Sequence, residues 1–224
     1  IEALDRLSPL TGDDKALLWS MREECLTRPR LMPKVLQAVD WGDPSAAAAA
    51  RALLLRWAPF GAPGPHKSHL VDAMELLDVR FADTAVREFA VVTLEQMRDD
   101  ELEQYLLQLV QLLKYELYHI SALSRFLVRR ALRNPLGVGN TLYWLLKSEM
   151  HDPHSHQRFG VVLDAYVRRC GPHRQMLFDS LTVESLLLEV AHDIKHVKKT
   201  DRLRITRERL SELNAVLPET FQLG

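Results

Sequence analysis

The sequence DTAVREFAVVTLEQMRDDELEQYLLQLVQLL, residues 83–113, decides the fold class. Asp83 is a typical helix N-cap residue, and the apolar residues after it recur on one helical face: Val86, Ala90, Leu94 and Met97. Asp99 or Asp100 then begins a second helix, whose inward face is expected to be Leu102, Tyr105, Leu106, Leu109, Val110 and Leu113. The short connection predicts an antiparallel pair. Asp83 and Arg87 lie one turn apart, which predicts an ion pair that supports the stack.

The layout of this pair is typical of a HEAT-type repeat, in which stacked neighbours complete a core that no single helix can form. A second pair of similar length is predicted at 121–134 and 135–150. We therefore expect an all-α protein, a right-handed superhelical stack of antiparallel helix pairs of the HEAT/armadillo-like α-solenoid kind. The helical domain is expected to span residues 1–216, with the start of a linker at 217–224.

Further helices are predicted on both sides of this region. Thr11 and Asp14 have the spacing of a capping box, which predicts a helix from about Asp13 to Thr27 that Pro29 ends. The other expected helices are 33–39, 45–57, 69–77, 159–167, 183–198 and 205–213. Residues 59–65 are rich in Gly and Pro and predict a break, and β-strand alternation is not sustained anywhere.

The composition is that of an ordinary folded domain. Hydrophobic residues make up 47% of the 224 residues, and 29 Lys and Arg stand against 30 Asp and Glu, which disfavours nucleic-acid binding. Cys25 and Cys170 have no metal or disulfide spacing. Because we find no apolar run of membrane-spanning length and no signal peptide, we expect a cytoplasmic protein. The chain begins without Met and is expected to be part of a longer protein.

Catalytic motifs are absent from the sequence. It has no Gly-x-Ser-x-Gly elbow, no Gly-rich phosphate loop and none of the kinase motifs that place a base and magnesium, so we expect no catalytic residue and no cofactor. His192 and His196 have the spacing of two zinc ligands on one helical face, but Asp193 stands where a metalloprotease needs Glu. His151, His154 and His156 are interpreted as part of a solvated turn. We therefore predict no metal site.

Arginines cluster at two places in the sequence. Arg125, Arg129, Arg130 and Arg133 form the first cluster, and Arg168 and Arg169 form the second. The aromatic residues that would stack bases are not interleaved with them. A solvated face or an intramolecular interface is therefore the favoured interpretation, and Arg129, Arg130 and Arg133 are the candidate interdomain basic face.

The sequence resembles the helical domain, also called the PIK or lipid kinase accessory domain, of class I phosphoinositide 3-kinase catalytic subunits. The segments that carry the resemblance are colinear over most of the chain: SPLTGDDKALLW at 8–19, YLLQLVQ at 105–111 with KYE at 114–116, SALSRFL at 121–127, RALRN at 130–134, Trp144 with SEM at 148–150, and RFGVVLDAY at 158–166. LPETF at 217–221 is similar to the linker that leads into the kinase domain.

The resemblance implies a non-catalytic scaffold inside a lipid kinase that phosphorylates the 3-position of phosphoinositides. It implies Ras-binding, C2 and kinase domains as intramolecular partners, and ATP and magnesium for a kinase domain outside this chain. The parent enzyme would be recruited to the inner face of the plasma membrane. The alternatives are a free-standing HEAT-like adaptor and, more remotely, a metal-dependent hydrolase that uses His192 and His196.

The resemblance also implies a regulatory surface just before the first helix. In family members that an SH2-containing subunit controls, this loop carries acidic residues. Here Pro9 and Gly12 stand at those places, with Asp13 and Asp14 next to them. Gly12, Asp13 and Asp14 are therefore the candidate regulatory interface. The pattern is similar to that of the gamma form, which implies a regulatory subunit or G-protein-linked adaptor as partner.

Overall fold

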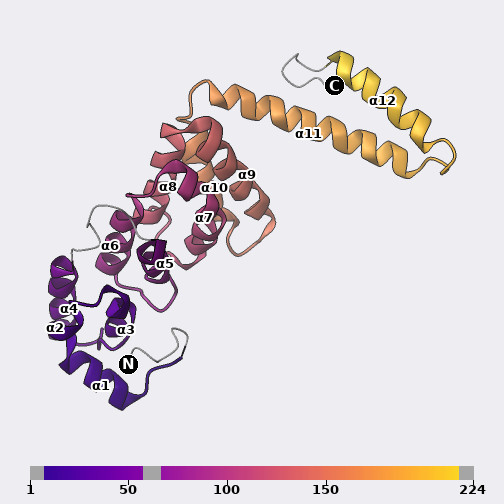
Figure 1. The fold of residues 1–224 in the computed structure, drawn as a ribbon. Helices are drawn as coiled ribbons and strands as arrows, with labels where there is room; N and C mark the ends of the chain where they lie inside the picture. The colour runs from indigo at the N-terminus through magenta and orange to yellow at the C-terminus, as the bar shows by residue number, and fades with distance from the viewer. Residues whose placement is uncertain (1–7, 58–66, 217–224) are drawn as a thin grey trace. The chain divides into compact units, whose positions relative to one another are not determined.

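The computed structural model describes residues 8–57 and 67–216, and every regular element in these two ranges is a helix (Figure 1). The predicted all-α class is confirmed. The chain divides into two compact units, unit 1 at residues 1–169 and unit 2 at residues 170–224. The predicted break at 59–65 and the predicted linker at 217–224 lie outside the described residues, and the limits of the helical domain stay a prediction.

Unit 1 begins with short helices: α1 (Gly12–Ser20), α2 (Arg22–Cys25), η1 (Pro29–Leu31), α3 (Met32–Gln37) and α4 (Pro44–Arg56). The expected helix from Asp13 to Thr27 is broken at Met21, whose φ of -96° and ψ of 13° are not helical. At this break the Arg22 guanidinium donates a hydrogen bond to the Trp19 carbonyl at 2.8 Å. The structure therefore has two helices where the periodicity predicts one.

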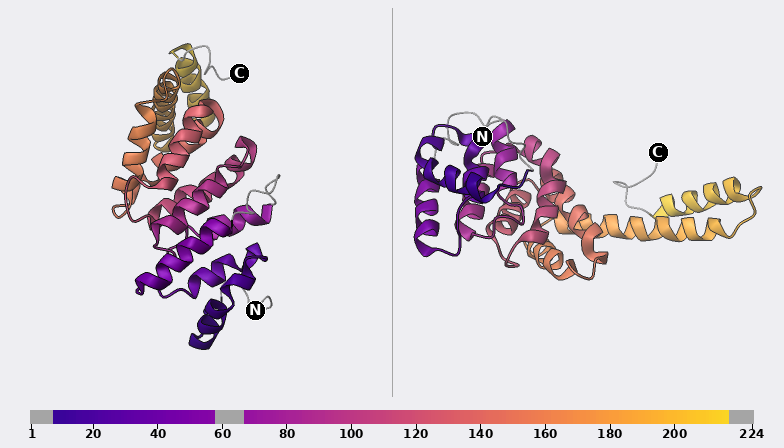
Figure 2. Two further views of the ribbon diagram at one scale, coloured as in Figure 1. Left: turned by 90° about the vertical axis from the view of Figure 1, so that its left-hand side faces the viewer. Right: turned by 90° about the horizontal axis from the view of Figure 1, so that it is seen from below.

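The rest of unit 1 consists of α5 (Lys67–Glu75), α6 (Thr84–Leu94), α7 (Asp99–Leu112), η3 (Leu113–Tyr115), α8 (Ala122–Arg133), η4 (Pro135–Gly139), α9 (Asn140–Ser148), η5 (Glu149–His151) and α10 (His156–Val167). Helices α4, α6, α8 and α10 each contact the next in the series, and α7 contacts α9. The helices therefore lie in successive layers, which Figure 2 shows in its left view. The right-handed superhelical sense stays a prediction.

The core of unit 1 includes the apolar face predicted for α7. Leu102, Leu106, Leu109 and Val110 are each 0% exposed, which confirms the placement of that face. Tyr105 is only half-buried. Apolar side chains from α6 and α8, among them Leu94 and Phe126, complete the same core.

The predicted ion pair between Asp83 and Arg87 is wrong. Asp83 caps α6 by accepting hydrogen bonds from the backbone N–H groups of Ala85 and Val86. Its second carboxylate oxygen accepts from Arg51 of α4 at 2.7 Å. Because a cap carboxylate must face the first turn of its helix, it does not reach Arg87 one turn further on.

Arg87 is instead buried against the segment after α7. Its guanidinium is 3.0 Å from Glu116 Oε1, and both side chains are 5% exposed. It also donates to three backbone carbonyls, those of Leu77, Asp78 and Phe81. Arg87 thus joins the α5–α6 turn, α6 and the end of the α7 region.

The predicted helix at 135–150 is three elements in the structure, because it begins with the π-helical turn η4 and ends with the 3-10 turn η5. Gly139 in η4 packs directly against α10. A Cβ atom at this position would lie 2.8 Å from Cζ of Tyr166 and 2.9 Å from the Ala131 carbonyl oxygen. Because Tyr166 is fully buried, this close approach fixes η4 against α8 and α10.

Unit 2 contains α11 (His173–Lys195) and α12 (Arg202–Val216), which contact each other. The sequence predicts two helices here, but α11 begins at His173 rather than near Val183. Its first turns carry the exposed apolar residues Met176 and Phe178, which obscure an amphipathic pattern. None of the helices in the described part of the chain is long and apolar enough to cross a membrane.

Candidate protein-interaction surface

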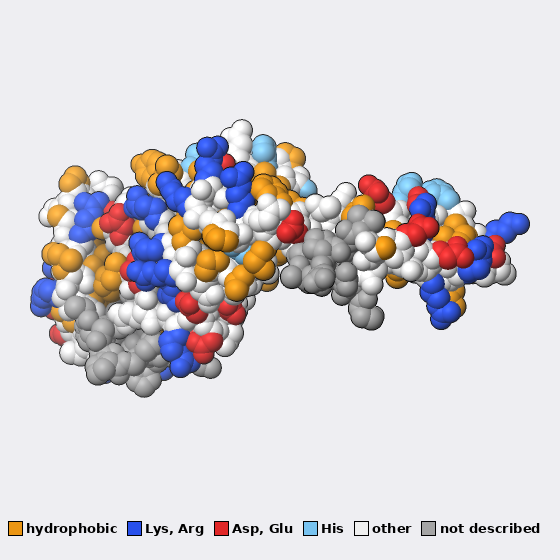
Figure 3. All heavy atoms as spheres, turned by 90° about the horizontal axis from the view of Figure 1, so that it is seen from above, with side chains coloured by type: hydrophobic (Ala, Val, Ile, Leu, Met, Phe, Trp, Pro, Cys, Tyr) orange, Lys and Arg blue, Asp and Glu red, His pale blue; other side chains and the backbone are white. Residues whose placement is uncertain are grey.

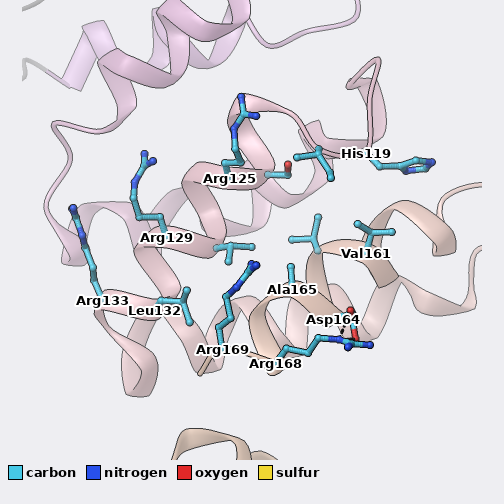
Figure 4. Close-up of a pocket in the computed structure, with 14 residues that line it drawn as sticks. His119, Arg125, Arg129, Leu132, Arg133, Val161, Asp164, Ala165, Arg168 and Arg169 are labelled. Carbon is cyan, nitrogen blue, oxygen red and sulfur yellow. Dashed lines mark hydrogen bonds and ion pairs between the residues drawn. The ribbon is translucent and has the colours of Figure 1, made fainter. Parts of the chain in front are cut away.

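Unit 1 has a groove between α8 and α10, with a volume of about 880 Å³ (Figure 4). We call it the basic groove. It is lined by His119, Ile120, Ser124, Arg125, Val128, Arg129, Leu132, Arg133, Val161, Val162, Asp164, Ala165, Arg168 and Arg169. Residues from two helices far apart in sequence therefore form one surface.

The floor of the basic groove is apolar. Val128 and Leu132 come from α8, and Val161 and Ala165 come from α10. Ile120, just before α8, is 68% exposed, and Val161 is 42% exposed. The floor therefore presents apolar side chains to solvent in a concave place, as protein-binding surfaces do.

The rim of the basic groove carries five arginines and one carboxylate. Arg125, Arg129 and Arg133 follow one face of α8 at intervals of four residues, and Figure 4 shows them along this helix. On the other side of the groove, the Arg169 side chain extends into the space between the helices. Arg168 Nε donates a hydrogen bond to Asp164 Oδ1 at 2.7 Å. Arg129 pairs with Glu95, the residue that follows α6.

The structure separates the three residues of the candidate interdomain basic face. Arg129 and Arg133 lie on the rim, whereas Arg130 is 6% exposed and does not line the groove. The Arg130 guanidinium donates to Asp99 Oδ1 at 2.6 Å, and Asn134 donates to the other oxygen of the same carboxylate at 3.1 Å. Arg130 therefore fixes α8 to the first residue of α7.

The hydrogen bond from Arg130 holds the pKa of Asp99 below its ordinary value. Partial burial acts in the opposite direction, and the bond from Asn134 adds to the lowering. The carboxylate is thus stabilised in its charged form by side chains of α8 and of the turn after it.

The two carboxylates of the candidate regulatory interface, at the start of α1, differ in their contacts. Asp14 accepts from the Thr11 backbone N–H at 3.0 Å and from the Thr11 hydroxyl at 2.6 Å, which confirms the capping box. These bonds lower the pKa of Asp14. Asp13 is exposed, as is Gly12, so of the two carboxylates Asp13 is the one that can face a partner.

Four of the candidate histidines contact backbone atoms or each other through their rings. His151 Nδ1 lies 2.5 Å from the Ser148 carbonyl oxygen, and His156 Nδ1 lies 2.9 Å from that of Pro153. The His192 and His196 rings contact edge to face at 5.0 Å between centroids. Within residues 8–57 and 67–216, no three His, Cys, Asp or Glu side chains gather in a way that could hold a metal ion.

The sequence pattern identifies the arginines on the rim of the groove but not the apolar residues of its floor. The four-residue spacing of Arg125, Arg129 and Arg133 places them on one face of α8. The contribution of Val161 and Ala165 depends on the contact between α8 and α10, which the spacing within either helix does not contain.

The layered helices and the exposed groove define a helical stack, a class of protein whose surfaces commonly bind other proteins. Residues 1–179 match the model of the phosphoinositide 3-kinase family accessory domain, or PIK domain. This chain therefore belongs to the PIK domain family, as its resemblance predicted.

Two relatives from Dictyostelium discoideum match almost the whole chain. Phosphatidylinositol 3-kinase 1 is 40% identical over 223 residues, which are 100% of this chain and 14% of the relative. Phosphatidylinositol 3-kinase 2 is 38% identical over 220 residues, which are 98% of this chain and 11% of the relative. The chain thus spans a small part of the length of these relatives. The similarity to the gamma form stays a prediction.

Proposed function

We propose that this chain is the non-catalytic helical scaffold of a phosphatidylinositol 3-kinase. The observation that carries the proposal is the match to relatives of that name, which covers this chain almost completely and each relative only to 14% or less. In such a protein the scaffold would organise Ras-binding, C2 and kinase domains. The kinase domain would use ATP and magnesium to phosphorylate the inositol 3-position of phosphoinositides.

Two features of unit 1 support a scaffold role. The buried network of Arg87 and Glu116 and the close packing of Gly139 against Tyr166 join successive helices. A support of this kind holds attached domains at fixed positions, because packed interiors transmit displacements instead of absorbing them. The exposed groups at Asp13 and on the groove rim remain available to those domains or to regulators.

Regulation through the start of α1 is the finer part of the proposal. A regulatory subunit or a G-protein-linked adaptor would meet the exposed Asp13 and the adjacent Gly12, while Asp14 keeps its bonds to Thr11. The enzyme would be cytoplasmic and would act after recruitment to the inner face of the plasma membrane.

The direct test compares this chain with the full-length product of its gene. We expect the full-length protein to convert phosphatidylinositol or its phosphates to 3-phosphorylated products with ATP and magnesium. We expect the 224-residue chain to show neither this activity nor ATP binding by calorimetry. A full-length product without a kinase domain, or one that lacks lipid kinase activity, would support the free-standing adaptor instead.

A further inference from the structure

We propose that the basic groove between α8 and α10 binds an acidic amphipathic helix of a separate partner protein. The proposal rests on the groove and its charges alone and does not require the lipid kinase function proposed above. Its support comes from the pairing state of the arginines, the apolar floor and the spacing of the charges.

The arginines of the groove carry more positive charge than the carboxylates beside them neutralise. Arg125, Arg133 and Arg169 are exposed and form no ion pair within the part of the chain that the structure describes. The two pairs at the rim, Arg129 with Glu95 and Arg168 with Asp164, are both solvent-exposed, so they hold their arginines only weakly. The site therefore has a net positive charge, although the whole chain has a formal charge of -1. Figure 3 shows Lys and Arg side chains beside hydrophobic ones on the face of unit 1 that is seen from above.

The apolar floor selects an amphipathic helix over a simple anion. Val128 and Leu132 on one side and Val161 and Ala165 on the other form a channel between two helices in contact. A third helix can place one apolar ridge in such a channel, as helices do when they pack. A bilayer surface is flat and fits a recessed channel less well than a helix does.

The arginine spacing defines the charge pattern of the bound helix. Arg125, Arg129 and Arg133 recur every four residues, which is about 6 Å along the helix axis. Glu or Asp residues at the same interval in a neighbouring helix would meet them in register. Guanidinium and carboxylate groups form paired, charge-assisted hydrogen bonds, which add geometric selectivity to the attraction.

The charge also favours a separate protein over a domain of the same chain. A tethered domain is already present at a millimolar effective concentration, so electrostatic attraction adds little to its encounter rate. Between separate molecules, a cluster of unneutralised charge accelerates encounter strongly. We therefore infer a reversible partner and not a permanently docked domain.

The test uses this chain and a fluorescent synthetic helix of 12 residues, which is the length of α8. The peptide carries Leu on one face and Glu on its flanks, and a matched peptide carries Lys in place of Glu. The groove variant is Arg125→Glu/Arg133→Glu/Arg169→Glu. The control variant is Arg56→Glu/Arg98→Glu/Arg204→Glu, which reverses three exposed arginines outside the groove, whose side chains are 59%, 72% and 65% exposed.

We expect the acidic peptide to bind the unmodified chain and the control variant equally, and the groove variant about tenfold more weakly or not at all. Binding should weaken as salt is raised, and the Lys peptide should not bind. Val161→Asp, which removes part of the apolar floor, should also weaken binding, so the result does not depend on the arginine variant alone.

Three outcomes would overturn the proposal. One is an affinity that the groove variant leaves unchanged, and another is equal binding of the Lys peptide. The third is the absence of peptide binding together with a groove-dependent association with phosphatidylserine vesicles or with a second copy of the chain. Sedimentation with vesicles and analytical ultracentrifugation detect these last two cases. Failure of the lipid kinase assay would leave this result unaffected.

Discussion

Arginines in two regions of unit 1 have opposite surroundings. On α6, Arg87 is 4% exposed and bonds to the Glu116 carboxylate and to three backbone carbonyls. On α8, Arg125 and Arg133 are exposed and form no ion pair among the described residues. A buried guanidinium must have its donors satisfied inside the protein, whereas an exposed one has its donors satisfied by water until a partner replaces that water. The comparison separates arginines that hold the fold from arginines available for binding.

The largest expected effect on stability comes from replacing the buried arginine, Arg87. Arg87→Met leaves the Glu116 carboxylate buried without its cation, and it removes donors from three carbonyls. We expect a loss of about 3 to 5 kcal/mol in the free energy of unfolding, measured by urea denaturation. The second change Glu116→Leu should recover part of the loss. A loss below about 1 kcal/mol would mean that water solvates this pair in solution.

Arg130→Met should have a smaller effect, about 1 to 3 kcal/mol, because the Asp99 side chain is 39% exposed and keeps its bond from Asn134. Arg130 does not line the groove, so affinity for the acidic peptide should not change. Urea denaturation and peptide titration of the same sample check both expectations. Reduced peptide affinity with unchanged stability would instead indicate that Arg130 belongs to the binding surface.

The Arg130–Asp99 pair should also depend on pH. The folded pKa of Asp99 is held below the ordinary 3.8, chiefly by Arg130, so its stabilising contribution is complete above that value. The contribution is lost as the pH falls through the lower, folded pKa. Arg130→Met should therefore cost more stability at about pH 6 than at about pH 2. Equal costs at both pH values would show that the pair is not the source of the shift.

The sequence predicts most of the fold because helix periods and caps are local. The buried face of α7, the capping box at Thr11 and the cap at Asp83 depend on residues within a few positions of each other. Predictions at single positions were less successful. The one-turn spacing predicts Asp83 as the partner of Arg87, but the carboxylate that Arg87 binds, Glu116, is 29 residues away.

The basic groove shows the same division between local and long-range information. Its α8 rim is visible in the spacing of Arg125, Arg129 and Arg133, since all three lie on one helix. The burial of Arg130 among these exposed neighbours depends on Asp99, and the groove floor depends on α10. A pattern within one helix identifies a face but does not show what packs against it.

The smallest expected effect on stability, and the most direct test of the comparison, belongs to the groove variant Arg125→Glu/Arg133→Glu/Arg169→Glu. One sample of this variant should be measured for both its free energy of unfolding and its affinity for the acidic peptide. We expect the free energy of unfolding to lie within about 0.5 kcal/mol of the unmodified chain, because these arginines form no ion pair in the described structure. We expect the peptide affinity to fall about tenfold or more. A loss of about 2 kcal/mol or more in stability with unchanged peptide affinity would contradict the account, because the groove arginines would then hold the fold as Arg87 does.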